Sequence, residues 1–140
     1  GFQINNGVLK KYTEEKGVTK IVIPDGVQRI GERAFSGCDN ITNVTIPDSV
    51  TSICNSVFAK CNSLTSVTIP DSVTSISYGA FQECGNLTSV TIPNSVTSIG
   101  KRAFLECGSL TSIAIPDSVI SIGDSAFEGC NFSSFTICDI

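Results

Sequence analysis

Short stretches of alternating apolar and polar residues recur along this chain. Within residues 41–46, Val44 and Ile46 alternate with polar residues, which predicts a short strand with one buried and one exposed face. Pro47 follows, and because proline lacks the N–H that a sheet needs, we expect the strand to end there in a turn. Residues 50–53 are apolar at both ends and predict a second extended segment.

A third element is expected after the second extended segment. Ala34, Phe35 and Cys38 have a spacing that fits a helix, which predicts one or two helical turns that pack Phe35 inward. The residue before this element is expected to form a tight bend, for which glycine is suited. Glycine holds that position in three of the five cases, and the residues in order are Gly31, Cys54, Ser77, Gly100 and Gly123.

The same set of elements returns about every 23 residues, within the range of leucine-rich repeats. The ranks of equivalent residues include Pro24, Pro47, Pro70, Pro93 and Pro116, and also Phe35, Phe58, Phe81, Phe104 and Phe127. Fixed spacing of large apolar residues predicts stacked coils with one shared core and a parallel sheet. Because helical turns need more room than strands, we expect an α/β repeat: a curved solenoid with its sheet on the concave face and short helical turns on the convex side.

The two ends depart from the repeat. An Asn6-Gly7 pair inside the alternating stretch 2–12 predicts a β-hairpin, and we interpret residues 1–17 as an N-terminal capping hairpin. Residues 18–131 are then the repeat coils, and 132–140 an incomplete last repeat that lacks one residue, which places Phe135 where the preceding coil has Ile113.

Composition narrows the possible functions. The 140 residues carry a net charge of -4, so the chain has no basic field that would attract nucleic acid. The sequence contains no run of about 18 apolar residues, so we expect no membrane-spanning segment. Histidine, the commonest general base and metal ligand, is absent. The sequence shows no nucleophile with its base, no phosphate loop and no metal-binding motif, so we expect no enzymatic activity and no cofactor.

Two further ranks could suggest metal or redox chemistry. Of the seven cysteines, five share one repeat position: Cys38, Cys61, Cys84, Cys107 and Cys130. No CxxC pair occurs, and we predict buried structural thiols rather than a zinc site, with Cys54 and Cys138 outside the rank and more exposed.

The residues after the prolines are Asp25, Asp48, Asp71, Asn94 and Asp117. A row of carboxylates could hold calcium, but turn capping accounts for the row without a metal, so we predict no metal site.

The outward positions of the predicted sheet carry small polar residues. They are Asn43, Thr45, Ser66, Thr68, Ser89, Thr91 and Ser112. A solvated sheet explains these residues, but repeat solenoids generally bind partners through their concave side. We therefore predict that this concave sheet face is a protein-binding surface.

The repeat resembles a known family. The phrase Ile69-Pro70-Asp71-Ser72-Val73-Thr74-Ser75-Ile76, followed by Gly79-Ala80-Phe81 and Cys84, is similar to the BspA-like class of leucine-rich repeats. The resemblance implies a right-handed solenoid without catalytic residues. It also implies a secreted or cell-surface protein of a host-associated microbe that binds a host extracellular-matrix or cell-surface protein. A structural spacer within a larger adhesin, with recognition elsewhere, is the alternative hypothesis.

Overall fold

The computed structural model describes residues 1–137, which form short strands and connecting turns. The first strands are β1 (Phe2–Asn5), β2 (Val8–Tyr12), β3 (Lys20–Val22), β4 (Arg29–Ile30), β5 (Asn43–Thr45) and β6 (Ser52–Ile53). They are followed by β7 (Ser66–Thr68), β8 (Ser75–Ile76), β9 (Ser89–Thr91), β10 (Ser98–Ile99), β11 (Ser112–Ile115), β12 (Ser121–Ile122) and β13 (Ser134–Ile137).

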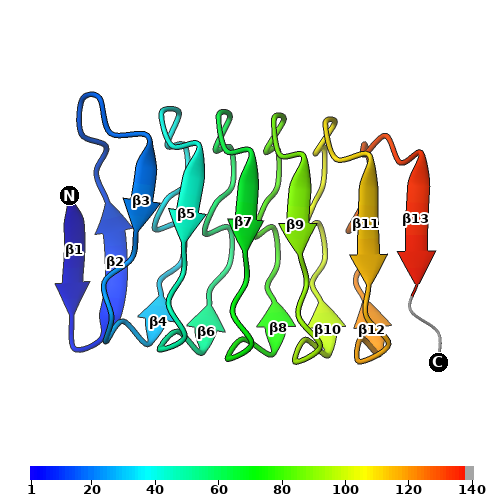
Figure 1. Ribbon diagram of the computed structural model, residues 1–140, viewed down its shortest axis with the longest axis horizontal. Coiled ribbons are helices and arrows are strands. Elements are labelled where there is room, and N and C mark those ends of the chain that lie inside the picture. Colours follow the sequence, from blue (N-terminus) through cyan, green and yellow to red (C-terminus); the bar gives the residue numbers. More distant parts are fainter. Residues whose placement is uncertain (138–140) are drawn as a thin grey trace.

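The strands lie in two rows along a solenoid (Figure 1). One row holds the odd-numbered strands from β3 to β13, and the other the even-numbered strands from β4 to β12. Neighbouring coils pair in parallel and in register, so that Asn43 pairs with Ser66 and Ser66 with Ser89. In the last pair Ile113 lies opposite Phe135, in agreement with the one-residue deletion in the sequence. The predicted strand and extended arm of each coil are thus present.

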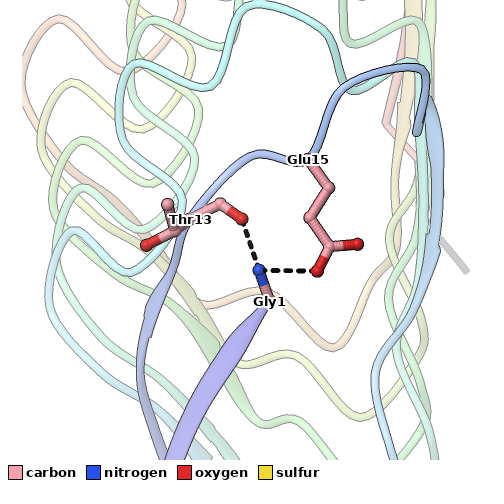
Figure 2. Close-up of polar contacts among 3 residues, drawn as sticks. All are labelled: Gly1, Thr13 and Glu15. Atoms are coloured by element: carbon pink, nitrogen blue, oxygen red, sulfur yellow. Dashed lines mark hydrogen bonds and ion pairs between the residues drawn. The ribbon is translucent and has the colours of Figure 1, made fainter.

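The chain begins with an antiparallel hairpin of β1 and β2. Asn6 and Gly7 have φ values of 51° and 75°, the backbone that a two-residue hairpin turn with matching twist requires. The terminal amino group of Gly1 donates a hydrogen bond to the Thr13 carbonyl at 2.6 Å and lies 3.0 Å from the Glu15 carboxylate (Figure 2). These contacts fasten β1 to the segment that leads into the first coil.

The interior is one continuous core of stacked equivalent residues. The four phenylalanines 35, 58, 81 and 104 are at most 1% exposed. Their rings stack with centroids 5.2 to 5.4 Å apart, and the row extends to Tyr12 at one end and Phe127 at the other. Offset stacked pairs add about 0.5–1.5 kcal/mol each to the burial of their area. The predicted shared core is therefore confirmed.

The turn segment, which we define as residues 31–38 and their equivalents in later coils, is not helical, so the predicted helical turns are wrong. Its N–H groups alternate between two kinds of partner. Those of Ala34 and Ser36 donate to the carbonyl three residues earlier, at 3.2 and 3.0 Å, whereas that of Phe35 donates to Val57 of the next coil at 2.9 Å. A helix would place each N–H on the carbonyl four residues earlier.

Two left-handed residues per coil produce this alternation. Arg33 has a φ of 57° and Gly37 of 75°, and the same two positions repeat as Ser56, Lys60, Gly79, Glu83, Arg102, Glu106, Ser125 and Gly129. Across residues 1–137 no element is a helix, and hence none is long and apolar enough to cross a bilayer. Without helical turns there is no wide convex side, and the expected α/β solenoid with a concave sheet is corrected to a parallel β-solenoid of about five turns.

Candidate functional site

The predicted binding residues lie on one side of the odd-numbered strand row. We call this surface the polar face, and it consists of Asn43, Thr45, Ser66, Thr68, Ser89, Thr91 and Ser112. On β5 and β7 the polar residues flank a buried valine, because side chains alternate between the two sides of a strand. Parallel registry aligns the first six residues in two ranks, and Ser112 opens β11, the next strand of the row.

One end of the polar face is tied together by side-chain hydrogen bonds. The Asn43 amide group donates to the Ser66 hydroxyl at 2.8 Å, and its oxygen accepts a hydrogen bond from Thr42 at 3.0 Å. Asn43 and Ser66 are half-buried as a result. This pair gives the first rank a fixed geometry between β5 and β7.

The second rank of the polar face keeps its hydroxyls free. Within the described residues, the side chains of Thr45, Thr68 and Thr91 are exposed and form no hydrogen bond to the protein. Threonines at another repeat position behave differently, because the hydroxyls of Thr65 and Thr88 each donate to a carbonyl of the preceding coil at 3.1 Å. The repeat thus uses threonine in two ways, and in the second rank the hydroxyl is available to solvent or a partner.

A shallow hollow lies across β5 and β7 on this face. Its lining includes Asn43, Thr45, Ser66 and Thr68 of the polar face. Asp48, from the turn after β5, also lines the hollow, a neighbour that the sequence pattern did not assign to the binding surface. The signal was present in the repeat, because aspartate follows the proline in four of the five coils.

The aspartate rank does not cap its turns. In each turn the backbone closes itself, as where Val50 donates to the Pro47 carbonyl at 3.1 Å. Ser49, next to Asp48, bonds to the Val27 carbonyl of the preceding coil at 2.8 Å. Among the described residues, the carboxylates of this rank have no hydrogen-bond or ion-pair partner. The turn-capping interpretation is therefore wrong, and the carboxylates point to solvent.

Four of the five cysteines in the rank are buried, as predicted, whereas Cys130 is half-buried. Cys61 and Cys84 are buried, and their thiols donate to carbonyls of the preceding coil at 3.1 and 3.0 Å. Burial raises the pKa of the Cys61 thiol to about 12 and that of Cys107 also to about 12. Burial likewise raises the pKa of the Cys84 thiol. Thiols that stay protonated are poor nucleophiles and poor metal ligands.

Cys54, outside the rank, is more exposed than the four buried cysteines of the rank but is half-buried, like Cys130. Its sulfur accepts a hydrogen bond from Arg29 Nε at 3.1 Å. Both line a second hollow on the even-numbered strand row, together with Ser77. Cys138 lies outside the described residues. Over residues 1–137, no group of three or more Cys, Asp or Glu is close enough to hold a metal ion.

Comparison with known proteins identifies the family. A model of the BspA type leucine-rich repeat region matches residues 9–134 in 6 copies. The chain belongs to the BspA-type leucine-rich repeat family. The resemblance seen in the sequence is thereby confirmed, and the family is related to bacterial surface antigens. No protein of curated function is significantly similar to the chain.

Solved bacterial structures share the fold. The chain is similar to a leucine rich cell surface protein of Faecalibacterium prausnitzii, with 34% identity and a TM-score of 0.91 over 95% of this chain and 35% of that chain. A leucine-rich repeat protein of T. pallidum is 33% identical, with a TM-score of 0.85 over 91% of this chain and 62% of that chain. A leucine-rich repeat protein of Bacteroides ovatus is 31% identical, with a TM-score of 0.84 over 97% of this chain and 38% of that chain. The chain thus spans 35% to 62% of these three proteins.

Proposed function

We propose that the chain is a non-catalytic protein-interaction module that binds its partner through the polar face. The free hydroxyls of Thr45, Thr68 and Thr91 carry this proposal. They recur along a parallel sheet at about 4.8 Å, and each can donate and accept a hydrogen bond. A protein partner that lies along the solenoid meets the same chemistry on every coil, so that many weak contacts add up.

The location follows from the same proposal. The family is one of bacterial surface proteins, and a relative from F. prausnitzii is described as a cell surface protein. We infer that this chain belongs to a secreted or cell-surface protein, and that its partner is a host extracellular-matrix or cell-surface protein. The acidic composition, with a net charge of -4, supports a protein rather than a nucleic-acid partner.

The test is a matched pair of double variants. Thr68→Arg with Thr91→Arg places two bulky cations on the polar face. Thr74→Arg with Thr97→Arg makes the same change at exposed threonines that directly precede β8 and β10 of the opposite strand row. Binding of both variants and the unaltered chain to a panel of immobilised host matrix and cell-surface proteins is measured by surface plasmon resonance. Thermal unfolding of each variant confirms that the coils remain folded.

The proposal expects the polar-face variant to lose at least one interaction of the unaltered chain, and the opposite-row variant to keep it. The loss should reach about ten-fold in Kd, equivalent to about 1.4 kcal/mol, because two bulky cations replace two of the exposed hydroxyls. Equal binding by both variants would instead favour a spacer whose recognition lies elsewhere.

A further inference from the structure

The odd-numbered strand row has an open edge where it begins. Within residues 1–137 its first sheet runs in the order β3-β5-β7-β9, so β3 pairs with β5 and has no strand on its other side. The even-numbered row differs, because β2 and β1 extend it beyond β4. The hairpin does not cover β3, since no Cα atom of β1 or β2 lies within 8 Å of one in β3. An unpaired strand edge is a template for a further strand.

The backbone groups on this open edge belong to Lys20 and Val22. The Thr19 carbonyl accepts a hydrogen bond from the following coil at 2.7 Å, and the Ile23 N–H donates one to that coil at 3.0 Å. Because backbone groups alternate in direction along a strand, those of Lys20 and Val22 point the opposite way, out of the sheet edge. Both residues are exposed, and on that side the described residues offer their N–H and C=O groups no partner.

A hollow beside the open edge can receive an apolar side chain. We call it the edge hollow, and its apolar lining consists of Phe2, Tyr12, Val18, Ile21 and Val22. Val22 is 68% exposed, although it occupies the rank that holds threonine in β5, β7 and β9. Covering this side chain removes apolar surface from water, which favours binding. The open edge thus combines free main-chain groups with an apolar pocket.

Lys20 gives the edge hollow a positive charge without a partner. Gly1 and Glu15 also line the hollow, but the amino group of the first and the carboxylate of the second pair with each other at 3.0 Å. In the part of the chain that the structure describes, ion pairs join Gly1 to Glu15 and Lys60 to Glu83, and none includes Lys20. A carboxylate on the partner is therefore complementary to this site.

We propose that an extended segment of a partner protein adds to β3 as a further strand, with an apolar side chain in the edge hollow and a carboxylate on Lys20. In strand addition, main-chain hydrogen bonds supply affinity and side-chain pockets supply specificity. The charged pair between Lys20 and an aspartate or glutamate fixes the position of the segment along β3. The site adjoins the polar face, because Lys20 pairs in register with Asn43, but it does not depend on the threonine hydroxyls of the proposed function.

The experiment is an NMR titration of the isotope-labelled chain with the peptide Thr-Leu-Thr-Asp-Thr, blocked at both ends. Leucine and aspartate lie two residues apart, so both side chains are on one face of an extended peptide. Val22→Pro removes an outward N–H but no hydrogen bond to β5, and proline is tolerated on such edges. Val22→Thr is the matched control, because it keeps the N–H and introduces the residue of the next three coils.

The proposal expects the peptide to shift the amide signals of Lys20 and Val22, and Val22→Pro to bind it about ten-fold more weakly than Val22→Thr. Lys20→Ser should weaken binding of this peptide but not of its asparagine analogue. No shift at these amides, or equal affinity of the two Val22 variants, overturns the proposal.

A second measurement needs no folded variant. A peptide methylated on every backbone nitrogen keeps its side chains but has no N–H groups, so the proposal expects it to lose binding to the unaltered chain. Binding as tight as that of the parent peptide overturns strand addition. The polar-face variants leave β3 unaltered, so failure of this inference and failure of the proposed function are distinguishable.

Discussion

At the scale of single residues, one repeat position has a role that the sequence alone could not reveal. It is occupied by glycine in three coils and by larger residues in two: Gly31, Cys54, Ser77, Gly100 and Gly123. Glycine was expected there for a tight bend, yet Gly100 has no left-handed backbone. A Cβ at Gly100 would instead lie 2.7 Å from the backbone of Ser77 in the preceding coil. The glycine is needed because the coils approach closely, a contact between residues far apart in sequence. Cys54 and Ser77, which replace it in two coils, line the hollow on the even-numbered strand row together with Gly31.

A matched pair of alanine substitutions tests this explanation. Gly100→Ala should lower the free energy of unfolding by about 1–3 kcal/mol, because the backbone of the neighbouring coil has to move. Gly85→Ala should change it by less than about 0.5 kcal/mol, because nothing lies within 4 Å of the added carbon. Urea unfolding followed by circular dichroism measures both. A similar loss in the two variants would refute the close-approach explanation.

The buried thiols predict a dependence of stability on pH. Burial raises the pKa of Cys61 from 9.0 to about 12, so above pH 9 the unfolded chain releases a proton that the folded chain keeps. Stability from this group is complete below pH 9 and is lost as the pH rises toward 12, by at most about 1.4 kcal/mol per pH unit. Urea unfolding from neutral to alkaline pH should show a shallower decline for Cys61→Ala than for the unaltered chain. Parallel declines would contradict the assigned pKa.

At the scale of elements, apolar periodicity predicted the strands but not the turn segment. Val44 lies on a strand, as its alternation with polar neighbours predicted. The spacing of Ala34, Phe35 and Cys38 fits a helical turn and a pair of successive tight turns equally well, because both structures bury the same side chains. Backbone hydrogen bonds decide between these structures, and here they run to the next coil. The sequence carries no local mark of such long-range partners.

The aromatic row predicts a gradient of stability from the centre to the end of the solenoid. Phe81 is 1% exposed and stacks between two rings, so Phe81→Ala should cost about 3–5 kcal/mol through lost burial and the cavity left behind. Phe2 is 36% exposed and stacks against one ring, that of Tyr12, so Phe2→Ala should lower the free energy of unfolding much less. Equal losses in chemical unfolding would show that the rings do not share one core.

At the scale of the whole molecule, the repeat period was enough to predict the shared core and the set of residues on the polar face, and the resemblance of the repeated phrase indicated the family. It was not enough to predict the shape, because curvature was argued from helical turns that are absent from residues 1–137. The partner also could not be predicted. The residues that repeat are those that form turns and strands, whereas the choice of a ligand depends on positions where the coils differ from one another. Asn94 among the aspartates is such a position.

The stacking of helix-free coils, which creates the polar face, can be measured directly by NMR couplings across hydrogen bonds in isotope-labelled protein. The account predicts a coupling from the Phe81 amide nitrogen to the Ala103 carbonyl of the next coil, where the two atoms are 2.8 Å apart, and one from Phe58 to Ala80 at 2.9 Å. A coupling from Phe81 to the Ser77 carbonyl, four residues earlier, would contradict it, because that bond belongs to a helix.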